Sequence, residues 1–211
     1  MEGTIYREIK YYRYPMHIFQ RTFIFLLLGI FGLTAEAGGG STPKSSPHVK
    51  LETNLGDIII ELNPEKAPIS VKNFLNYVNE GFYNGTIFHR VIKNFMIQGG
   101  GFDETFNQKS THSPIQNEAD NGLANEIGTI AMARTPDPNS ATAQFFINTA
   151  DNKFLNFQSK TTQGWGYAVF GKVTEGIDIV RAIENTPTGR QNGYTDVPLK
   201  QIIIKQASVI N

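Results

Sequence analysis

The feature that most constrains this chain is the stretch from Phe88 to Phe102, FHRVIKNFMIQGGGF. Two runs rich in β-branched and aromatic residues, Phe88–Ile92 and Phe95–Gln98, flank the polar pair Lys93-Asn94, and this pattern predicts two paired strands. Three consecutive glycines follow, and glycine lets a backbone approach another segment closely or adopt conformations closed to other residues. The stretch therefore predicts a hairpin that packs tightly against its surroundings.

The register of this hairpin decides what faces its one arginine. Side chains alternate along a strand, so we expect Phe88, Arg90 and Ile92 to share one face. A two-residue turn would place Arg90 opposite Ile97, whereas a three-residue or bulged connection would place it opposite Gln98. We favour the second register, because it gives Arg90 a polar partner on an otherwise apolar face.

Two interpretations of Arg90 follow from this position. It could be a surface arginine on a half-exposed strand, since arginine is rarely buried without a partner. It could instead be a fixed guanidinium in an apolar cleft, directed at the carbonyl or amide of a ligand, a task that suits five rigid donors and a permanent charge. The neighbouring glycines favour the second interpretation.

The rest of the chain adds short strands and few helices. Apolar stripes at helical spacing predict helices at Pro68–Glu80 and Gly176–Glu184. Alternating or continuous apolar runs predict further strands at 48–54, 57–62, 128–134, 143–148, 167–173 and 199–210. Many short strands with two helices indicate a mainly β protein, a closed antiparallel barrel with helical caps.

The N-terminal region resembles an export signal. The apolar run Phe23–Leu33 follows basic residues and precedes Ala35-Glu36-Ala37, which predicts a signal peptide over residues 1–37 that is cleaved after Ala37. The run is short for a transmembrane helix, although an uncleaved anchor is the alternative. Residues 38–47 have the composition of a flexible linker, and the folded domain is expected over 48–211, without stable membrane insertion after cleavage.

Composition removes several kinds of chemistry. The chain has no cysteine, its formal net charge is zero, and its four histidines are scattered. These facts argue against thiol catalysis, a metal site and nucleic-acid binding. We interpret His89 as a structural histidine that alternation turns away from Arg90, towards the core. An apolar groove with Arg90, Gln98 and Gln144 as polar groups remains, and it could bind a peptide or catalyse a reaction that breaks no covalent bond.

Five stretches carry a resemblance to a known family. FHRVIKNFMIQGGGF, GTIAMAR, AQFFIN, FLN and YAVFGKV resemble the cyclophilin family of peptidyl-prolyl isomerases, most closely its bacterial periplasmic branch, over His48–Asn211. The resemblance implies an eight-stranded antiparallel β-barrel capped by two α-helices, without cofactor or metal. It also implies a monomeric periplasmic enzyme whose partners are proline-containing unfolded or flexible polypeptides.

The resemblance also implies a set of site residues. The catalytic group would comprise Arg90, Gln98 and Phe95. The substrate-binding residues would be Met96, Ala133, Arg134, Gln144, Phe146, Phe154, Leu155 and Tyr167. Phe154, Tyr167 and Arg134 stand where the best-known eukaryotic members have tryptophan, histidine and asparagine. Because Phe154 lacks an indole N–H, we expect weak cyclosporin binding.

The implied mechanism follows from the physics of the amide bond. Resonance gives the peptide C–N bond a rotation barrier of about 18–20 kcal/mol, and X–Pro isomerisation is slow enough to limit folding. A hydrogen bond from Arg90 to the prolyl nitrogen would weaken that resonance in the twisted state. We therefore expect an isomerase that assists the folding of exported proteins. The alternatives are a proline-directed peptide-binding chaperone or scaffold without essential turnover, and an envelope-anchored structural protein.

Overall fold

The structure is a computed structural model, and it describes residues 46–210. The predicted signal peptide over 1–37 and the linker as far as residue 45 lie outside the described residues. Between residues 46 and 210, no helix combines the length and the apolar character that crossing a bilayer requires.

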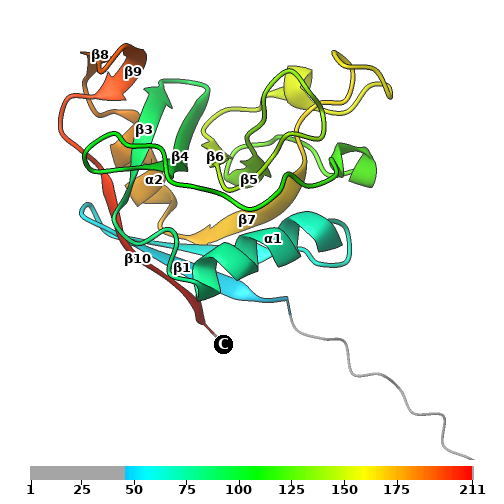
Figure 1. Cartoon of the computed structure of the whole chain (residues 1–211), viewed down its shortest axis with the longest axis horizontal. Coiled ribbons are helices and arrows are strands. Elements are labelled where there is room, and N and C mark those ends of the chain that lie inside the picture. Colours follow the sequence, from blue (N-terminus) through cyan, green and yellow to red (C-terminus); the bar gives the residue numbers. More distant parts are fainter. Residues whose placement is uncertain (1–45, 211) are drawn as a thin grey trace, which may run out of the picture. The chain divides into compact units, whose positions relative to one another are not determined.

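Eight antiparallel strands form a closed barrel, which confirms the predicted fold class (Figure 1). Around the barrel they follow the order β1-β10-β3-β4-β6-β5-β7-β2. Their bounds are β1 His48–Thr53, β2 Asp57–Leu62, β3 Thr86–Ile92, β4 Met96–Asp103, β5 Thr129–Met132, β6 Phe145–Asn148, β7 Val169–Glu175 and β10 Ile203–Ile210. Several are shorter than their apolar runs predicted, because the ends of those runs continue into loops.

Two helices pack on the barrel, as the apolar stripes predicted. Helix α1 (Pro68–Asn79) contacts β10 and β7, and helix α2 (Ile177–Glu184) contacts β2, β3 and β4. Helix α1 has proline in its first turn and no capping side chain of its own. The carboxylate of Glu118 instead accepts the backbone N–H groups of Ile69 and Ser70 at 2.9 and 2.8 Å. A residue remote in sequence therefore satisfies donors that every helix N-terminus leaves free.

The barrel interior is a single apolar cluster to which both helices contribute. Phe74 of α1 lies at its centre, fully buried, with ring centroids 5.2 Å from Tyr83, 5.6 Å from Phe145 and 5.2 Å from Phe170. Val180 of α2 belongs to the same cluster. Burial of this many large side chains is the main source of the domain's stability.

One hairpin was not among the predicted elements. Strands β8 (Thr188–Gln191) and β9 (Tyr194–Pro198) pair with each other outside the barrel, and β9 lies beside β3 (Figure 1). Their connection is Asn192-Gly193, with φ of 51° and 82°. Positive φ at both central residues is typical of a two-residue hairpin turn, for which Asn-Gly is the preferred sequence. Two short 3₁₀ turns, η1 (Ala119–Asn121) and η2 (Lys153–Leu155), complete the described elements.

Candidate active site

The β3–β4 hairpin has the register that gives Arg90 a polar partner. Ile92 pairs with Met96 and Arg90 with Gln98, so three residues connect the strands, as predicted. Asn94, the middle residue of this connection, has φ of 57°. Its backbone N–H donates to Glu184 of α2 at 2.8 Å. The Glu184 side chain on α2 thus holds the turn of the hairpin that carries Arg90.

Of the three residues predicted to share a face, Arg90 and Ile92 do so, but the prediction is wrong for Phe88. Phe88 pairs with Gly99 while Arg90 pairs with Gln98, so β3 has one extra residue at His89. Such a bulge reverses the alternation locally. Phe88 therefore lies in the barrel interior, whereas Ile92 packs on the outer cluster and Arg90 lines an outer cavity.

The bulge also places His89 differently from the prediction. His89 is buried, with its ring centroid 4.7 Å from that of Phe102, and it lines a surface cavity together with Arg90 instead of facing away from it. Among residues 46–210 its Nδ1 atom has no hydrogen-bond partner. Burial, together with the charge of neighbouring Arg90, lowers the pKa of His89 to about 4. The imidazole is therefore neutral near pH 7.

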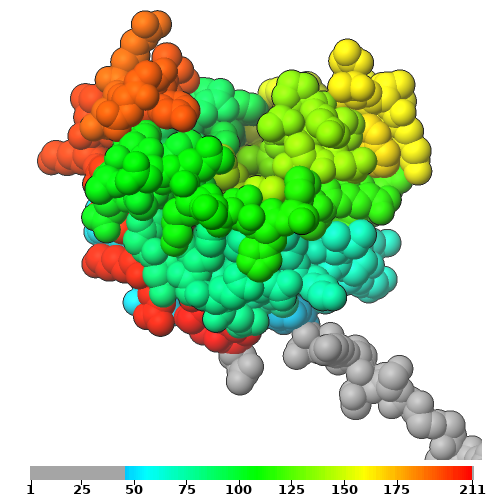
Figure 2. Space-filling model, viewed as in Figure 1, coloured from blue at the N-terminus to red at the C-terminus, as the bar shows by residue number. Residues whose placement is uncertain are grey.

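A cavity of about 200 Å³ opens on the outer face of the barrel, beside Arg90. In the space-filling view the surface is hollowed between the green β3–β4 segment and the lime to yellow segments (Figure 2). The lining contains nine of the eleven predicted site residues: Arg90, Phe95, Met96, Gln98, Ala133, Arg134, Phe146, Leu155 and Tyr167. Distant segments of the chain thus converge on one pocket, and we call it the outer pocket.

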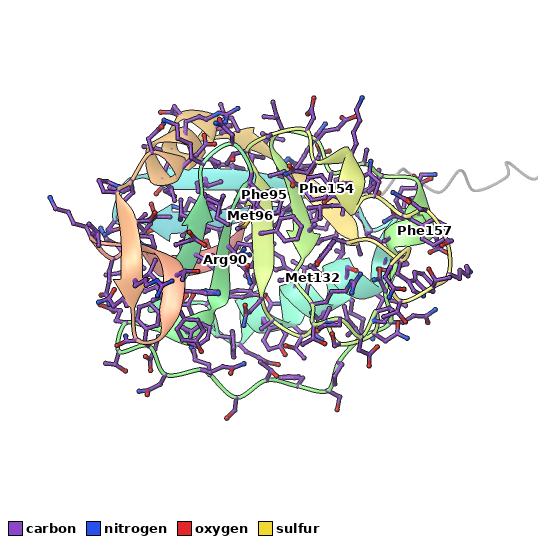
Figure 3. The ribbon with its side chains drawn as sticks, turned by 90° about the horizontal axis from the view of Figure 1, so that it is seen from above. Arg90, Phe95, Met96, Met132, Phe154 and Phe157 are labelled. Atoms are coloured by element: carbon purple, nitrogen blue, oxygen red, sulfur yellow. The ribbon has the colours of Figure 1, made fainter. Side chains whose placement is uncertain are left out.

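The other two predicted residues lie beside the outer pocket. Phe154 of η2 is 67% exposed, and its ring stacks on that of Phe95 with centroids 5.7 Å apart. Figure 3 shows the labelled Phe95, Met96 and Phe154 close together, with Arg90 nearby. Gln144 accepts a hydrogen bond from Gln98 at 3.0 Å. Phe154 therefore forms a rim, and Gln144 extends the polar side.

The floor of the outer pocket is apolar and belongs to a second cluster, separate from the barrel interior. Its buried members are Met96, Ala131, Phe146, Leu155 and Val169. Met96 and Phe146 are 2% and 4% exposed. Small residues such as Ala131 leave room between the larger ones. A floor of this kind suits a compact apolar group rather than a charged one.

The two arginines of the outer pocket have different roles. Arg134 donates from Nε to the carbonyl of Gly166 at 2.9 Å and from Nη1 to the carbonyl of Thr135 at 2.9 Å, and its guanidinium lies 4.6 Å over the ring of Tyr167. Arg90 makes one long hydrogen bond within the described residues, from Nη1 to Gln98 Oε1 at 3.4 Å. Arg134 is thus engaged in holding a wall, while most donors of Arg90 are available to a ligand.

The triple glycine explains how Gln144 reaches the site. A Cβ atom at Gly101 would lie 2.5 Å from the Gln144 side chain, which would have to move away. Gly100 has φ of 79°, and a Cβ there would lie 2.8 Å from the Tyr83 ring. This confirms the prediction of close backbone approach.

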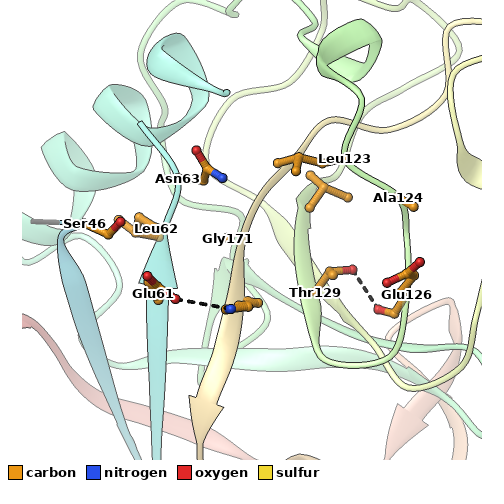
Figure 4. A pocket seen from close by; sticks show the side chains of 11 residues that line it. Ser46, Glu61, Leu62, Asn63, Leu123, Ala124, Glu126, Thr129 and Gly171 are labelled. Carbon is orange, nitrogen blue, oxygen red and sulfur yellow. Dashed lines mark hydrogen bonds and ion pairs between the residues drawn. The ribbon is translucent and has the colours of Figure 1, made fainter. Parts of the chain in front are cut away.

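A larger cavity, of about 280 Å³, lies elsewhere on the barrel wall (Figure 4). Side chains from β2, β7 and the segment 123–129 line it, and Glu61 and Lys172 face each other across 3.5 Å. Its lining contains neither an aromatic ring nor an arginine. Within residues 46–210, no cluster of three acidic, histidine or cysteine side chains could hold a metal ion. The outer pocket is therefore the stronger candidate for the active site.

The sequence prediction missed the buried polar groups that hold the backbone of the outer pocket. Buried asparagines, among them Asn125 and Asn148, bond to one another, and Asn125 also bonds to the carbonyls of Leu155 and Tyr167. Asn148 ends the AQFFIN stretch, but nothing in its local sequence distinguishes it from an ordinary strand terminus. The signal that could identify such residues is burial of a polar side chain, and only the fold reveals that burial.

Comparisons with known proteins agree with this geometry. The family model described as cyclophilin type peptidyl-prolyl cis-trans isomerase/CLD matches residues 48–209. The chain is 60% identical to peptidyl-prolyl cis-trans isomerase cyp18 of Streptomyces antibioticus, covering 77% of this chain and 98% of the relative. It is 57% identical to peptidyl-prolyl cis-trans isomerase B of Escherichia coli (strain K12), covering 76% and 98%.

Solved structures give the same result. A cyclophilin type peptidyl-prolyl cis-trans isomerase of Cryptosporidium parvum matches with a TM-score of 0.65 and 30% identity, covering 79% of this chain and 98% of that chain. A crystal structure of the same protein in the presence of the dipeptide Ala-Pro matches with a TM-score of 0.64, covering 78% and 99%. The chain described here belongs to the cyclophilin-type peptidyl-prolyl cis-trans isomerase family, and it is an isomerase of peptide bonds that precede proline.

Proposed function

We propose that this isomerase works by a hydrogen bond from Arg90 to the nitrogen of the substrate's prolyl bond. In the planar amide the nitrogen lone pair is delocalised into the carbonyl, which produces a barrier of about 18–20 kcal/mol. In the twisted amide the lone pair is localised and accepts a hydrogen bond. A donor fixed beside the nitrogen therefore stabilises the twisted state more than the planar one, which is the condition for catalysis.

The observation that carries this proposal is the position of Arg90 beside an apolar floor. Its guanidinium lines the same cavity as Phe95, Met96 and Phe146, and one long bond to Gln98 leaves most of its donors unused within the described residues. In this proposal the floor holds the proline ring while the preceding carbonyl rotates. No proton transfer and no cofactor take part in such a rotation.

Gln98 and Gln144 complete the polar side of the site. Gln98 accepts from Arg90 through Oε1 and donates through Nε2 to Gln144 at 3.0 Å. This directional chain restrains the guanidinium without neutralising it. A donor held in place before the reaction pays no reorganisation cost in the transition state.

We further propose that the substrates are exported polypeptides and that the enzyme works in the periplasm. The support comes from the signal-like pattern of residues 1–37, with Phe23–Leu33 as the apolar core and Ala35-Glu36-Ala37 as the cleavage site. Protein purified from the envelope of the producing cells should begin near Gly38 in N-terminal sequencing. An intact chain starting at Met1 and recovered from membranes would contradict export by cleavage.

The test of the mechanism separates catalysis from binding. Arg90→Ala should lower kcat by about a hundred- to a thousand-fold, the usual loss for one preorganised donor, while peptide affinity changes little. Arg90→Lys should restore little activity, because an ammonium lacks the planar fork of donors. The measurements are the isomerisation rate of an Ala-Pro peptide and its binding by titration, for wild type and both variants.

Thermal melts of the same variants provide the control. Stability should change little, because Arg90 is part-exposed and makes a single long hydrogen bond within the described residues. Equal losses in affinity and in rate would mean that Arg90 only anchors the peptide. The proline-directed binding module would then be the better description.

A further inference from the structure

Hydrogen-bonded to the backbone of the outer pocket lies a connected set of asparagine side chains that the proposed mechanism does not use. Asn125, Asn148 and Asn152 are buried, with exposed fractions of 1%, 0% and 3%, and Asn156 is half-buried. Primary amides are rarely placed in such positions unless their donors and acceptors are satisfied. These four residues, which we call the asparagine relay, satisfy one another and the backbone of the pocket.

Asn148 is the centre of the asparagine relay. Its Oδ1 accepts from Asn152 Nδ2 at 2.7 Å. Its Nδ2 donates to Asn125 Oδ1 at 3.1 Å and to Thr129 Oγ1 at 2.9 Å. Asn148 pairs with Met96 in the β4–β6 ladder but does not itself line the outer pocket, and its side chain reaches the pocket walls through its two asparagine partners.

Asn152 connects the relay to the side of the outer pocket formed by Phe95, which we call the Phe95 wall. Asn152 Nδ2 donates to the backbone carbonyl of Phe95 at 2.8 Å, and the backbone N–H of Thr149 donates to the same carbonyl at 2.9 Å. Phe95 ends the connection between β3 and β4, where no strand pairing would otherwise fix it. Together with the bond from the Phe95 N–H to the carbonyl of Ile92 at 3.2 Å, these two bonds fix the backbone that carries the aromatic ring.

Asn125 connects the relay to the side of the outer pocket formed by Leu155 and Tyr167, which we call the Leu155–Tyr167 wall. Asn125 Nδ2 lies 3.3 Å from the carbonyl of Leu155 and 3.3 Å from that of Tyr167. Asn156 Oδ1 accepts from the backbone N–H of Asn125 at 2.7 Å and from its Nδ2 at 3.1 Å. One buried amide thus joins two separate segments of the pocket wall.

We infer that the asparagine relay sets the spacing between the Phe95 wall and the Leu155–Tyr167 wall, and that its members are positioning residues for the proline ring. Apolar contact is non-directional and tolerates sliding, whereas buried hydrogen bonds fix both distance and orientation. The relay connects these walls through the side chain of Asn148 and through a bond from the backbone N–H of Asn152 to the carbonyl of Asn125 at 2.8 Å. The inference rests on the proposed seat of the proline ring in the outer pocket.

The test removes the centre of the relay and measures KM and kcat separately. Asn148→Leu keeps a similar volume but loses both amide functions. Because the walls grip the ring in the planar and twisted states alike, KM for an Ala-Pro peptide should rise about tenfold while kcat stays within about twofold of wild type, since small displacements of binding groups have effects of this order. This is the opposite split from Arg90→Ala.

Thr86→Val is the matched control. Thr86 is fully buried on β3, and its hydroxyl donates to the carbonyl of Tyr83 at 2.6 Å, away from the outer pocket. This variant also removes a buried hydrogen bond, yet KM should stay at the wild-type value. An equal rise of KM in Thr86→Val would show that general loss of stability is the cause, and would overturn the inference.

Two further outcomes decide the matter. A folded Asn148→Leu with KM within about twofold of wild type, or with a fall in kcat alone, would overturn the inference. If Asn148→Leu does not fold, Asn156→Ala replaces it, because Asn156 is half-buried and its loss is better tolerated. A rise of KM of about threefold in Asn156→Ala would support the inference, and an unchanged KM would overturn it. Failure of the Arg90 mechanism is recognised separately, by an unchanged kcat in Arg90→Ala.

Discussion

The barrel wall of this isomerase carries two apolar clusters, one on each face, and they are built on different principles. On β6 Phe145 points into the barrel and Phe146 into the outer pocket, and on β5 Ile130 and Ala131 divide in the same way. The inner cluster is large, closed and fully buried. The outer cluster is small and opens to solvent at Phe95 and Tyr167.

The difference lies in what fixes each cluster. Inside the barrel, side chains are enclosed on all sides, so close packing is the main determinant of their positions. On the outer face one side is left open for substrate, and packing cannot hold the walls apart. Directional bonds from Arg134, Asn125 and Asn152 take over that task. A rigid barrel thus supports a site whose own shape depends on hydrogen bonds.

The largest expected effect comes from damaging the inner cluster. Phe74→Ala should destabilise the domain by about 3–5 kcal/mol, because it removes a fully buried ring that contacts three other aromatic rings. Isomerisation measured well below the melting temperature should keep its wild-type kcat and KM. Urea unfolding and a low-temperature assay together check this. A strong loss of activity in the folded variant would show that the two faces are not independent.

His89 tests the boundary between the two regions, since it is buried on β3 between Phe88, which faces the barrel interior, and Arg90, which lines the outer pocket. The pKa of His89 is lowered to about 4, so between pH 6.5 and pH 4 the unfolded chain binds a proton that the folded protein does not. The free energy of unfolding should therefore fall as pH falls through this window, by up to roughly 3 kcal/mol from this one group.

The matched variant is His89→Phe, which keeps an aromatic ring against Phe102 but cannot titrate. Chemical unfolding of wild type and variant at intervals from pH 7 to pH 4 gives the two slopes. The decline should be smaller in the variant, whatever its stability at pH 7. Parallel slopes would mean that His89 is protonated in the folded protein, contrary to its burial beside Arg90.

Much of this fold could be predicted from local patterns, because alternation and apolar stripes record which side of an element is buried. The Arg90–Gln98 register was also predictable, since an arginine on an apolar face needs a polar partner. The prediction from strict alternation failed at Phe88. A β-bulge after this residue, which no local sequence pattern indicates, turns Phe88 to the opposite face of the strand from Arg90. The β8–β9 hairpin carries a sequence signal in Asn192-Gly193, the preferred pair for a two-residue hairpin turn.

The supports of the site could not be predicted, for a physical reason. Asn125 and Asn148 are 23 residues apart, and Asn152 bonds Phe95 across 57 residues. Each contact depends on how the barrel closes, and an asparagine that will be buried has the same local sequence as one that caps a turn. Helix α1 is similar, because its N-terminal donors are satisfied by Glu118 from a distant loop.

The smallest expected effect concerns the exposed rim of the outer cluster. Phe154 is 67% exposed and stacks on Phe95, so a larger ring at this position can reach a ligand without disturbing the floor. Phe154→Trp adds an indole N–H, which seeks an acceptor such as a carbonyl of cyclosporin. One added hydrogen bond contributes about 1 kcal/mol, so cyclosporin affinity should improve by roughly five- to tenfold while kcat for an Ala-Pro peptide is unchanged.

Titration of wild type and variant with cyclosporin measures the gain in affinity. Phe154→Tyr, with an O–H in a different place, controls for added polarity. Equal affinities in Phe154→Trp and wild type would mean that the rim does not contact the ligand, and that the floor and Arg90 alone determine what the outer pocket binds.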